Sequence, residues 1–109
     1  MDNVKDNAYY VHKIVENLKF IIKYTKDVDK DELEKNELLL NAMLFALVQI
    51  SEDAKKLDDG FVIAHPKIPW KDIYGLRNRI VHDYGNVDLS IIFLTLKEDI
   101  PKLLDLLKN

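Results

Sequence analysis

The fold is decided by residues 40–57, which read LNAMLFALVQISEDAKKL. Apolar and small side chains recur in this stretch at steps of three and four residues, the spacing that aligns them along one face of an α-helix. Gly60 follows as a stop signal. The stretch therefore predicts a long helix with one apolar stripe, which consists of Leu40, Met43, Leu47, Ile50, Ala54 and Leu57.

A second stripe of the same kind precedes it. Between residues 4 and 22 the same steps recur and predict a helix of about six turns, lined by Val4, Ala8, Val11, Val15, Leu18 and Ile22. An acidic cluster then breaks the pattern, and its carboxylates predict the N-cap and first turn of the helix that contains residues 40–57. These carboxylates belong to Asp27, Asp29, Asp31 and Glu32.

The C-terminal half is divided by its prolines. Residues 61–70, FVIAHPKIPW, contain two prolines three residues apart and predict a connector. Pro69 is expected at or next to the first turn of a third helix, which ends by Asn86. Either Asn86 or Asp88 can cap a fourth helix, and Pro101 is expected to kink this helix or to split off its last turns.

These patterns predict an all-α fold. No segment alternates with period two over the length of a strand, so we expect four or five helices in an up-and-down bundle, forming one domain over residues 1–109. The fourth helix has apolar residues on more than one face, which is more than a small bundle can cover. We therefore expect a homodimer.

Composition limits the possible functions. Cys is absent, so no disulfide, thiol nucleophile or cysteine zinc site is available. The N-terminal residues lack a signal-peptide pattern and no apolar run approaches the length of a membrane span, so we expect a soluble, cytoplasmic protein with no membrane partner. The formal net charge of −3 gives no support to a large electrostatic footprint on nucleic acid. Any contact with RNA must be local.

The densest chemistry lies in residues 77–84, which read RNRIVHDY. Arg77 stays charged at any biological pH and His82 can exchange a proton near neutrality, a pair able to cleave a phosphodiester without a metal. Positions five apart differ by roughly 140° around an ideal helix, so the two residues of one chain do not naturally converge on one phosphate. Two chains packed about a two-fold axis could line one cleft with both, and Gly75 would permit close backbone approach there.

Two neighbours of this pair have predicted roles. Gly75, Asn78 and His82 share one helix face, so Asn78 can hold the imidazole in one tautomer. Tyr84 falls at the end of the helix, where it either covers the edge of the bundle or is open to a partner.

The other polar candidates have ordinary interpretations. We expect His12 to be a solvated or core-edge histidine and His65 to be a turn residue. A solvated helix face is the expectation for Glu52 and Asp53, although Glu52 is also a candidate to orient an Arg or a His. Without Cys, with scattered His and without paired carboxylates beside the motif, the sequence predicts neither a metal site nor a cofactor.

The string RNRIVHDY resembles the motif of HepT-like toxins, members of the HEPN superfamily of small α-helical ribonucleases: arginine, four residues, histidine, any residue, tyrosine. The likeness extends to HPKIPW at residues 65–70, to YGNVD at residues 84–88 and to EDAKKL at residues 52–57. It covers nearly the whole chain, with one difference in that Gly85 stands where the family often has an aromatic residue.

The resemblance implies a metal-independent, dimeric endoribonuclease that acts as the toxin of a toxin–antitoxin pair. His82 would act as the base on a ribose 2′-hydroxyl or as the acid on the leaving 5′-oxygen. Arg77 would stabilise charge on phosphorus, and Asn78 would orient the imidazole. A cyclic 2′,3′-phosphate would be the product. The resemblance also implies a minimal nucleotidyltransferase antitoxin that adenylylates Tyr84, adding bulk and negative charge that exclude RNA. A non-catalytic helical partner, or an RNA-binding subunit, of such a nucleotidyltransferase is the alternative.

Overall fold

The computed structural model describes residues 5–82 and 86–108, and every regular element in this part of the chain is helical. The elements are α1 (Asn7–Thr25), α2 (Lys30–Lys35), α3 (Glu37–Ala54), α4 (Asp59–Ala64), α5 (Trp70–His82), α6 (Leu89–Leu94), the π-helical segment η1 (Thr95–Asp99) and α7 (Ile100–Lys108). The all-α prediction is confirmed for the residues described. No helix among them combines the length and the apolar character needed to cross a lipid bilayer.

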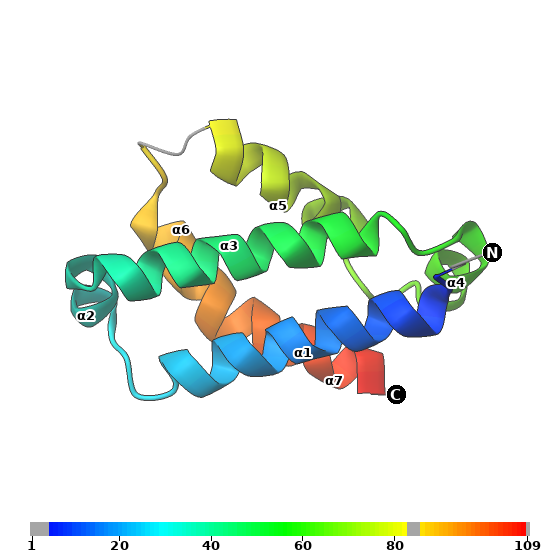
Figure 1. The fold of residues 1–109 in the computed structure, drawn as a ribbon, viewed down its shortest axis with the longest axis horizontal. Helices are drawn as coiled ribbons and strands as arrows, with labels where there is room; N and C mark the ends of the chain where they lie inside the picture. The colour runs from blue at the N-terminus through cyan, green and yellow to red at the C-terminus, as the bar shows by residue number, and fades with distance from the viewer. Residues whose placement is uncertain (1–4, 83–85, 109) are drawn as a thin grey trace.

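Helix α3 lies at the centre of the fold. It packs against α1 and against α5, while α7 packs against α1, and α1, α3, α5 and the run from α6 to α7 alternate in direction (Figure 1). The predicted stripe faces the core: Leu40 is half-buried, and the buried members are Met43, Leu47, Ile50, Ala54 and Leu57. The stripe therefore anchors α3 between its two neighbours.

The acidic cluster begins a short separate helix, which corrects the prediction of one long helix. Asp29 caps α2 through a capping box with Glu32. Asn36 then ends α2, because its backbone leaves the helical conformation (φ −103°, ψ 87°), and it caps α3, because its Oδ1 accepts from the N–H of Leu39 at 3.0 Å. One asparagine side chain thus divides two helices that the apolar pattern joins.

Helix α4 corrects the prediction of a stop at Gly60 and a connector from Phe61. The carboxylate of Asp58 accepts from the N–H of Phe61 at 2.9 Å and caps α4, so Gly60 lies inside a helix. The hydrogen bonds from the Phe61 N–H and from the Asn7 side chain lower the pKa of Asp58 below its ordinary value. This cap therefore stabilises the fold above the ordinary carboxyl pKa, and its contribution is lost as the pH falls through the lowered value.

The entry to α5 follows the prediction from the prolines. Pro69 directly precedes the helix, and its carbonyl accepts from the N–H of Ile73. The indole N–H of Trp70 donates to the carbonyl of His65 at 3.0 Å, which confirms His65 as a residue of the turn. This hydrogen bond ties the first residue of α5 to the connector before it.

The last helical run changes direction near Pro101. Asp88 caps α6, and the five residues of η1 stand immediately before the proline-containing turn of α7, where the run bends (Figure 1). Proline lacks the N–H that an α-helical turn requires, and a widened π turn accommodates this loss. Most apolar side chains of the run are buried or half-buried within the chain, and the large exposed ones are Ile91 and Leu94. The run accordingly leaves less surface for a dimer than the sequence suggested.

Lys97 joins this run to the end of α1. Its Nζ donates to the carbonyl oxygens of Thr25 and Lys26, which belong to the group of helix-end carbonyls without partners inside the helix. We expect Lys97→Met to lower the free energy of unfolding by about 1–3 kcal/mol, since hydrogen bonds from charged groups are lost while the side-chain stem remains. Urea denaturation measures the change. The exposed Lys67 serves as control through Lys67→Met, and equal losses in the two variants would contradict the prediction.

Candidate active site

Helix α5 presents the motif on the outside of the bundle. Its buried residues, Trp70, Ile73 and Ile80, face the core. Asn78 and His82 are exposed, and Arg77 is half-buried at the junction with α3. The motif side chains therefore remain accessible while the helix that bears them is held firmly by its apolar side.

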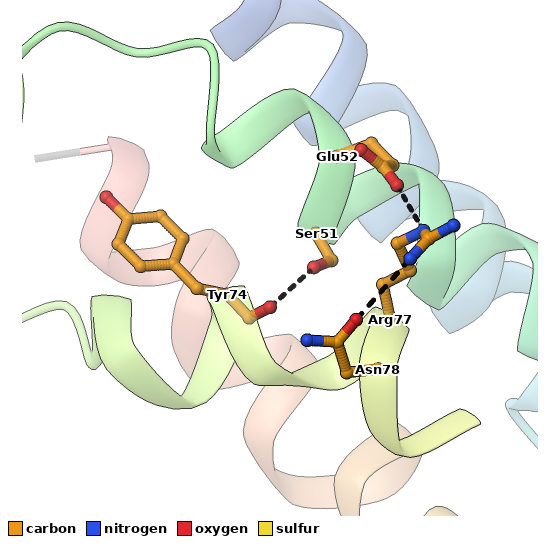
Figure 2. A network of polar contacts seen from close by, with 5 residues as sticks. All are labelled: Ser51, Glu52, Tyr74, Arg77 and Asn78. Atoms are coloured by element: carbon orange, nitrogen blue, oxygen red, sulfur yellow. Dashed lines mark hydrogen bonds and ion pairs between the residues drawn. The ribbon is translucent and has the colours of Figure 1, made fainter. Parts of the chain in front are cut away.

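Arg77 is paired with a carboxylate of α3. Its Nε lies 2.6 Å from Oε1 of Glu52, and its Nη1 donates to Oδ1 of Asn78 at 3.4 Å (Figure 2). Glu52, expected on a solvated helix face, is thus partly exposed but in contact with an arginine, which is the other role for which it was a candidate. Asn78 is directed at Arg77, and within the described chain no hydrogen bond joins it to His82. The orienting role of Asn78 toward His82 stays a prediction.

A partly buried hydrogen bond next to this pair joins α5 to α3. The hydroxyl of Ser51, which is fully buried, donates to the backbone carbonyl of Tyr74 at 3.2 Å. Figure 2 shows this bond beside the Arg77–Glu52 pair, with the ring of Tyr74 pointing away from Arg77. Because Ser51 precedes Glu52 directly and Tyr74 lies one turn before Arg77, the bond sets the position from which both charged side chains meet.

Arg77 and His82 lie on different sides of α5. Arg77 is turned toward Glu52 of α3, whereas His82 is exposed in the last turn of the helix. This placement agrees with the poor convergence expected within one chain. Tyr84, the predicted site of adenylylation, lies outside the described residues.

Asp53 corrects the prediction of a solvated carboxylate. It is 5% exposed and its Oδ1 lies 3.3 Å from Nζ of Lys13, because α1 packs over this side of α3. Its other oxygen is buried without a hydrogen-bond partner among the described atoms. His12 is exposed on α1, as expected. Among residues 5–82 and 86–108, no three His, Asp or Glu side chains gather as a possible metal site.

The sequence patterns missed an apolar groove between α3 and α5. Its lining consists of Asn41, Leu44, Phe45, Val48, Ile80 and Val81. Phe45 and Val81 are 65% and 48% exposed, so two large apolar side chains, one from each helix, meet water at this groove. We call this surface the Phe45–Val81 groove. It begins one helical turn from the Arg77–Glu52 pair along both helices. The sequence feature that could have revealed this groove is Phe45, a large apolar residue that lies outside the core stripe of α3.

The family model and the similar proteins of known name agree with one another, since all of them are described as ribonucleases. A family model described as "Ribonuclease HepT-like" matches residues 14–109, which include α3 and α5. A protein of Methanocaldococcus jannaschii named "Putative RNase MJ1380" is 32% identical over 99 residues, 91% of each chain. "Putative RNase TTE0752" of Caldanaerobacter subterraneus is 33% identical over 94 residues, 86% of this chain and 84% of that one. "Probable ribonuclease HepT" of Thermococcus cleftensis is 31% identical over 94 residues, 86% of each chain. No solved structure matches the chain.

Gly75 offers a test of how closely a second chain approaches α5. A Cβ at this position would meet the guanidinium of Arg79 at 3.5 Å, an ordinary contact, so one chain has room for alanine. We expect Gly75→Ala to leave the stability unchanged or to raise it by up to about 1 kcal/mol, because alanine favours the helix. Thermal unfolding measures this change.

The sequence predicts a close approach of two chains at Gly75, and an added methyl group would separate their backbones, so the same variant should associate more weakly in sedimentation equilibrium. Ser90→Ala on the exposed side of α6 is the control and should leave association unchanged. A lower melting temperature of Gly75→Ala at concentrations where the wild-type chain is monomeric would contradict the first expectation, and unchanged association would contradict the second.

Proposed function

We propose that this chain, which belongs to the HepT-like ribonuclease family of the HEPN superfamily, is a metal-independent endoribonuclease and the toxin of a toxin–antitoxin pair. The family match and the names of the relatives support a ribonuclease activity. One observation carries the finer proposal: Arg77, a permanent cation, is held by Glu52 at the surface of the helix that also exposes His82. This helix therefore supplies a phosphate-binding group and a proton-transfer group.

The two side chains supply complementary parts of one reaction. A neutral His82 accepts the proton of a ribose 2′-hydroxyl, and the 2′-oxygen forms a bond to phosphorus as the bond from phosphorus to the 5′-oxygen breaks. The leaving 5′-oxygen takes a proton from an imidazolium, the protonated form of His82, and departs as a hydroxyl. Arg77 stabilises the negative charge on the phosphoryl oxygens throughout. The products are a cyclic 2′,3′-phosphate and a free 5′-hydroxyl.

A homodimer would complete the site. Arg77 and His82 of one chain lie on different sides of α5, so a second α5 related by a two-fold axis offers the missing partner for each. The Phe45–Val81 groove supports this arrangement, because it exposes apolar surface beside the motif where a second copy would cover it. We propose that the dimer forms over this groove and the exposed side of α5.

Control of this activity would act on the same site. Tyr84 stands two residues after His82, and a nucleotidyltransferase antitoxin that adenylylates its phenol would add bulk and negative charge there. The added phosphate would compete with RNA for Arg77. A modification so close to the catalytic pair therefore silences cleavage without unfolding the chain.

The first prediction concerns the chemistry. The purified chain should cleave RNA in excess EDTA and leave cyclic 2′,3′-phosphate ends, because the side chains provide both proton transfer and charge stabilisation. His82→Ala and Arg77→Ala should each lower the rate by roughly 100- to 1000-fold. His12→Ala and Arg79→Ala, which remove an exposed histidine on α1 and another arginine of α5, are controls and should retain activity. Loss of cleavage in EDTA together with an active His82→Ala variant would overturn the mechanism.

The second prediction concerns control. Coexpression with a minimal nucleotidyltransferase should add the mass of one or more adenylyl groups to this chain, and peptide mapping should place the addition on Tyr84. Tyr84→Phe should lose the modification and escape inhibition. Tyr24→Phe, which removes an exposed phenol on α1, should behave as the wild type. Inhibition without any added mass would point to occlusion by the partner instead, and a chain that binds the partner but never cleaves RNA would support the non-catalytic alternative.

A further inference from the structure

We infer that Glu52 is a positioning residue for Arg77, which it holds by Nε so that the outer edge of the guanidinium meets the scissile phosphate; this rests on the proposed ribonuclease function. The guanidinium has five N–H donors in one plane. Glu52 accepts from Nε at 2.6 Å, a short and charge-assisted contact. The pair formed by Nη1 and Nη2 is the edge left for bidentate binding of a phosphate.

The contact with Asn78 is compatible with this arrangement. It joins Nη1 to Oδ1 at 3.4 Å, near the upper limit for a hydrogen bond, so an arriving phosphate oxygen can displace it. The contact with Glu52 is much shorter and lies on the other side of the guanidinium. Substrate can therefore exchange with Asn78 while Glu52 keeps the plane of Arg77 in place.

The backbone beneath the pair is fixed. The hydrogen bond from the buried Ser51 hydroxyl to the carbonyl of Tyr74 joins α3 and α5 within one residue of Glu52 and one turn of Arg77. Because the backbones of the two helices are held together here, the Glu52 and Arg77 side chains can form their ion pair in few conformations. The guanidinium is thus oriented before RNA arrives, and this prior orientation is what a reaction of precise geometry requires.

The exposure of the pair argues against a structural role. Both side chains are 42% exposed, and ion pairs of this kind contribute little to folding because water and salt screen them. The neighbouring pair of Lys13 and Asp53 is the opposite case, since the Asp53 side chain is only 7% exposed. Consecutive residues of α3 thus supply one ion pair suited to orienting a reactive group and one suited to packing, which provides a matched control.

Steady-state cleavage of a short RNA tests the inference. Glu52→Ala should lower kcat by roughly 10- to 100-fold, because loss of a group that orients an active residue commonly has this effect. KM should stay the same or fall, because the charge of Arg77 is no longer offset by a carboxylate. Glu52→Gln keeps an oxygen acceptor at the same reach and should restore most of kcat. The melting temperatures of both variants should stay close to that of the wild type.

A double-mutant cycle and the matched control complete the experiment. In an Arg77→Ala background, Glu52→Ala should cost nothing further, because a positioning residue acts only through its partner. Lys13→Met should lower the melting temperature and leave kcat within about two-fold, as expected for a change far from the reacting atoms. Wild-type kcat in Glu52→Ala, or an equal loss of kcat in the Arg77→Ala background, would overturn the role of Glu52 while the ribonuclease stands. A wild-type chain that never cleaves RNA would overturn the proposed function and this inference together.

Discussion

The packing of α3 on both α1 and α5 is the constraint on which the rest of the structure depends. Three consecutive residues near its C-terminal end make the relevant contacts: Ser51 bonds to the backbone of α5, Glu52 pairs with Arg77 of α5, and Asp53 pairs with Lys13 of α1. Successive residues on a helix differ by about 100° in direction, so adjacent side chains reach different neighbours. A single turn of α3 therefore positions both α1 and α5.

The sequence predicts the long helices well because their apolar side chains repeat with the helical period. It does not predict where α2 ends and α3 begins, since Asn36 interrupts the backbone without interrupting the apolar pattern. Helix α4 was missed for a similar reason. Asp58 caps it, and Gly60, expected to stop a helix, lies in its first turn. In both places a local hydrogen bond from a side chain decides the boundary.

The sequence likewise predicts only part of the candidate site. The motif residues Arg77 and His82 can be recognised from the sequence, because their types and spacing carry chemical meaning. The partner of Arg77 depends on how α3 and α5 are placed in register, and the 24 positions between Glu52 and Arg77 contain no pattern that specifies it. Asp53 was assigned to solvent for the same reason, since its burial follows from α1 and not from neighbours in sequence.

Under the proposed function, the ion pair also accounts for how an acidic chain would present an arginine to a phosphate. With a net charge of −3 the protein does not attract RNA over a long range, and Glu52 offsets the positive charge of Arg77 locally. A phosphate would then be repelled by the surrounding negative charges. It would bind the guanidinium most tightly where its oxygens match the edge formed by Nη1 and Nη2. Binding under these conditions depends on geometry more than on charge. The proposed site would favour RNA that fits it over polyanions in general, because an unpaired arginine would bind any phosphate that reaches it.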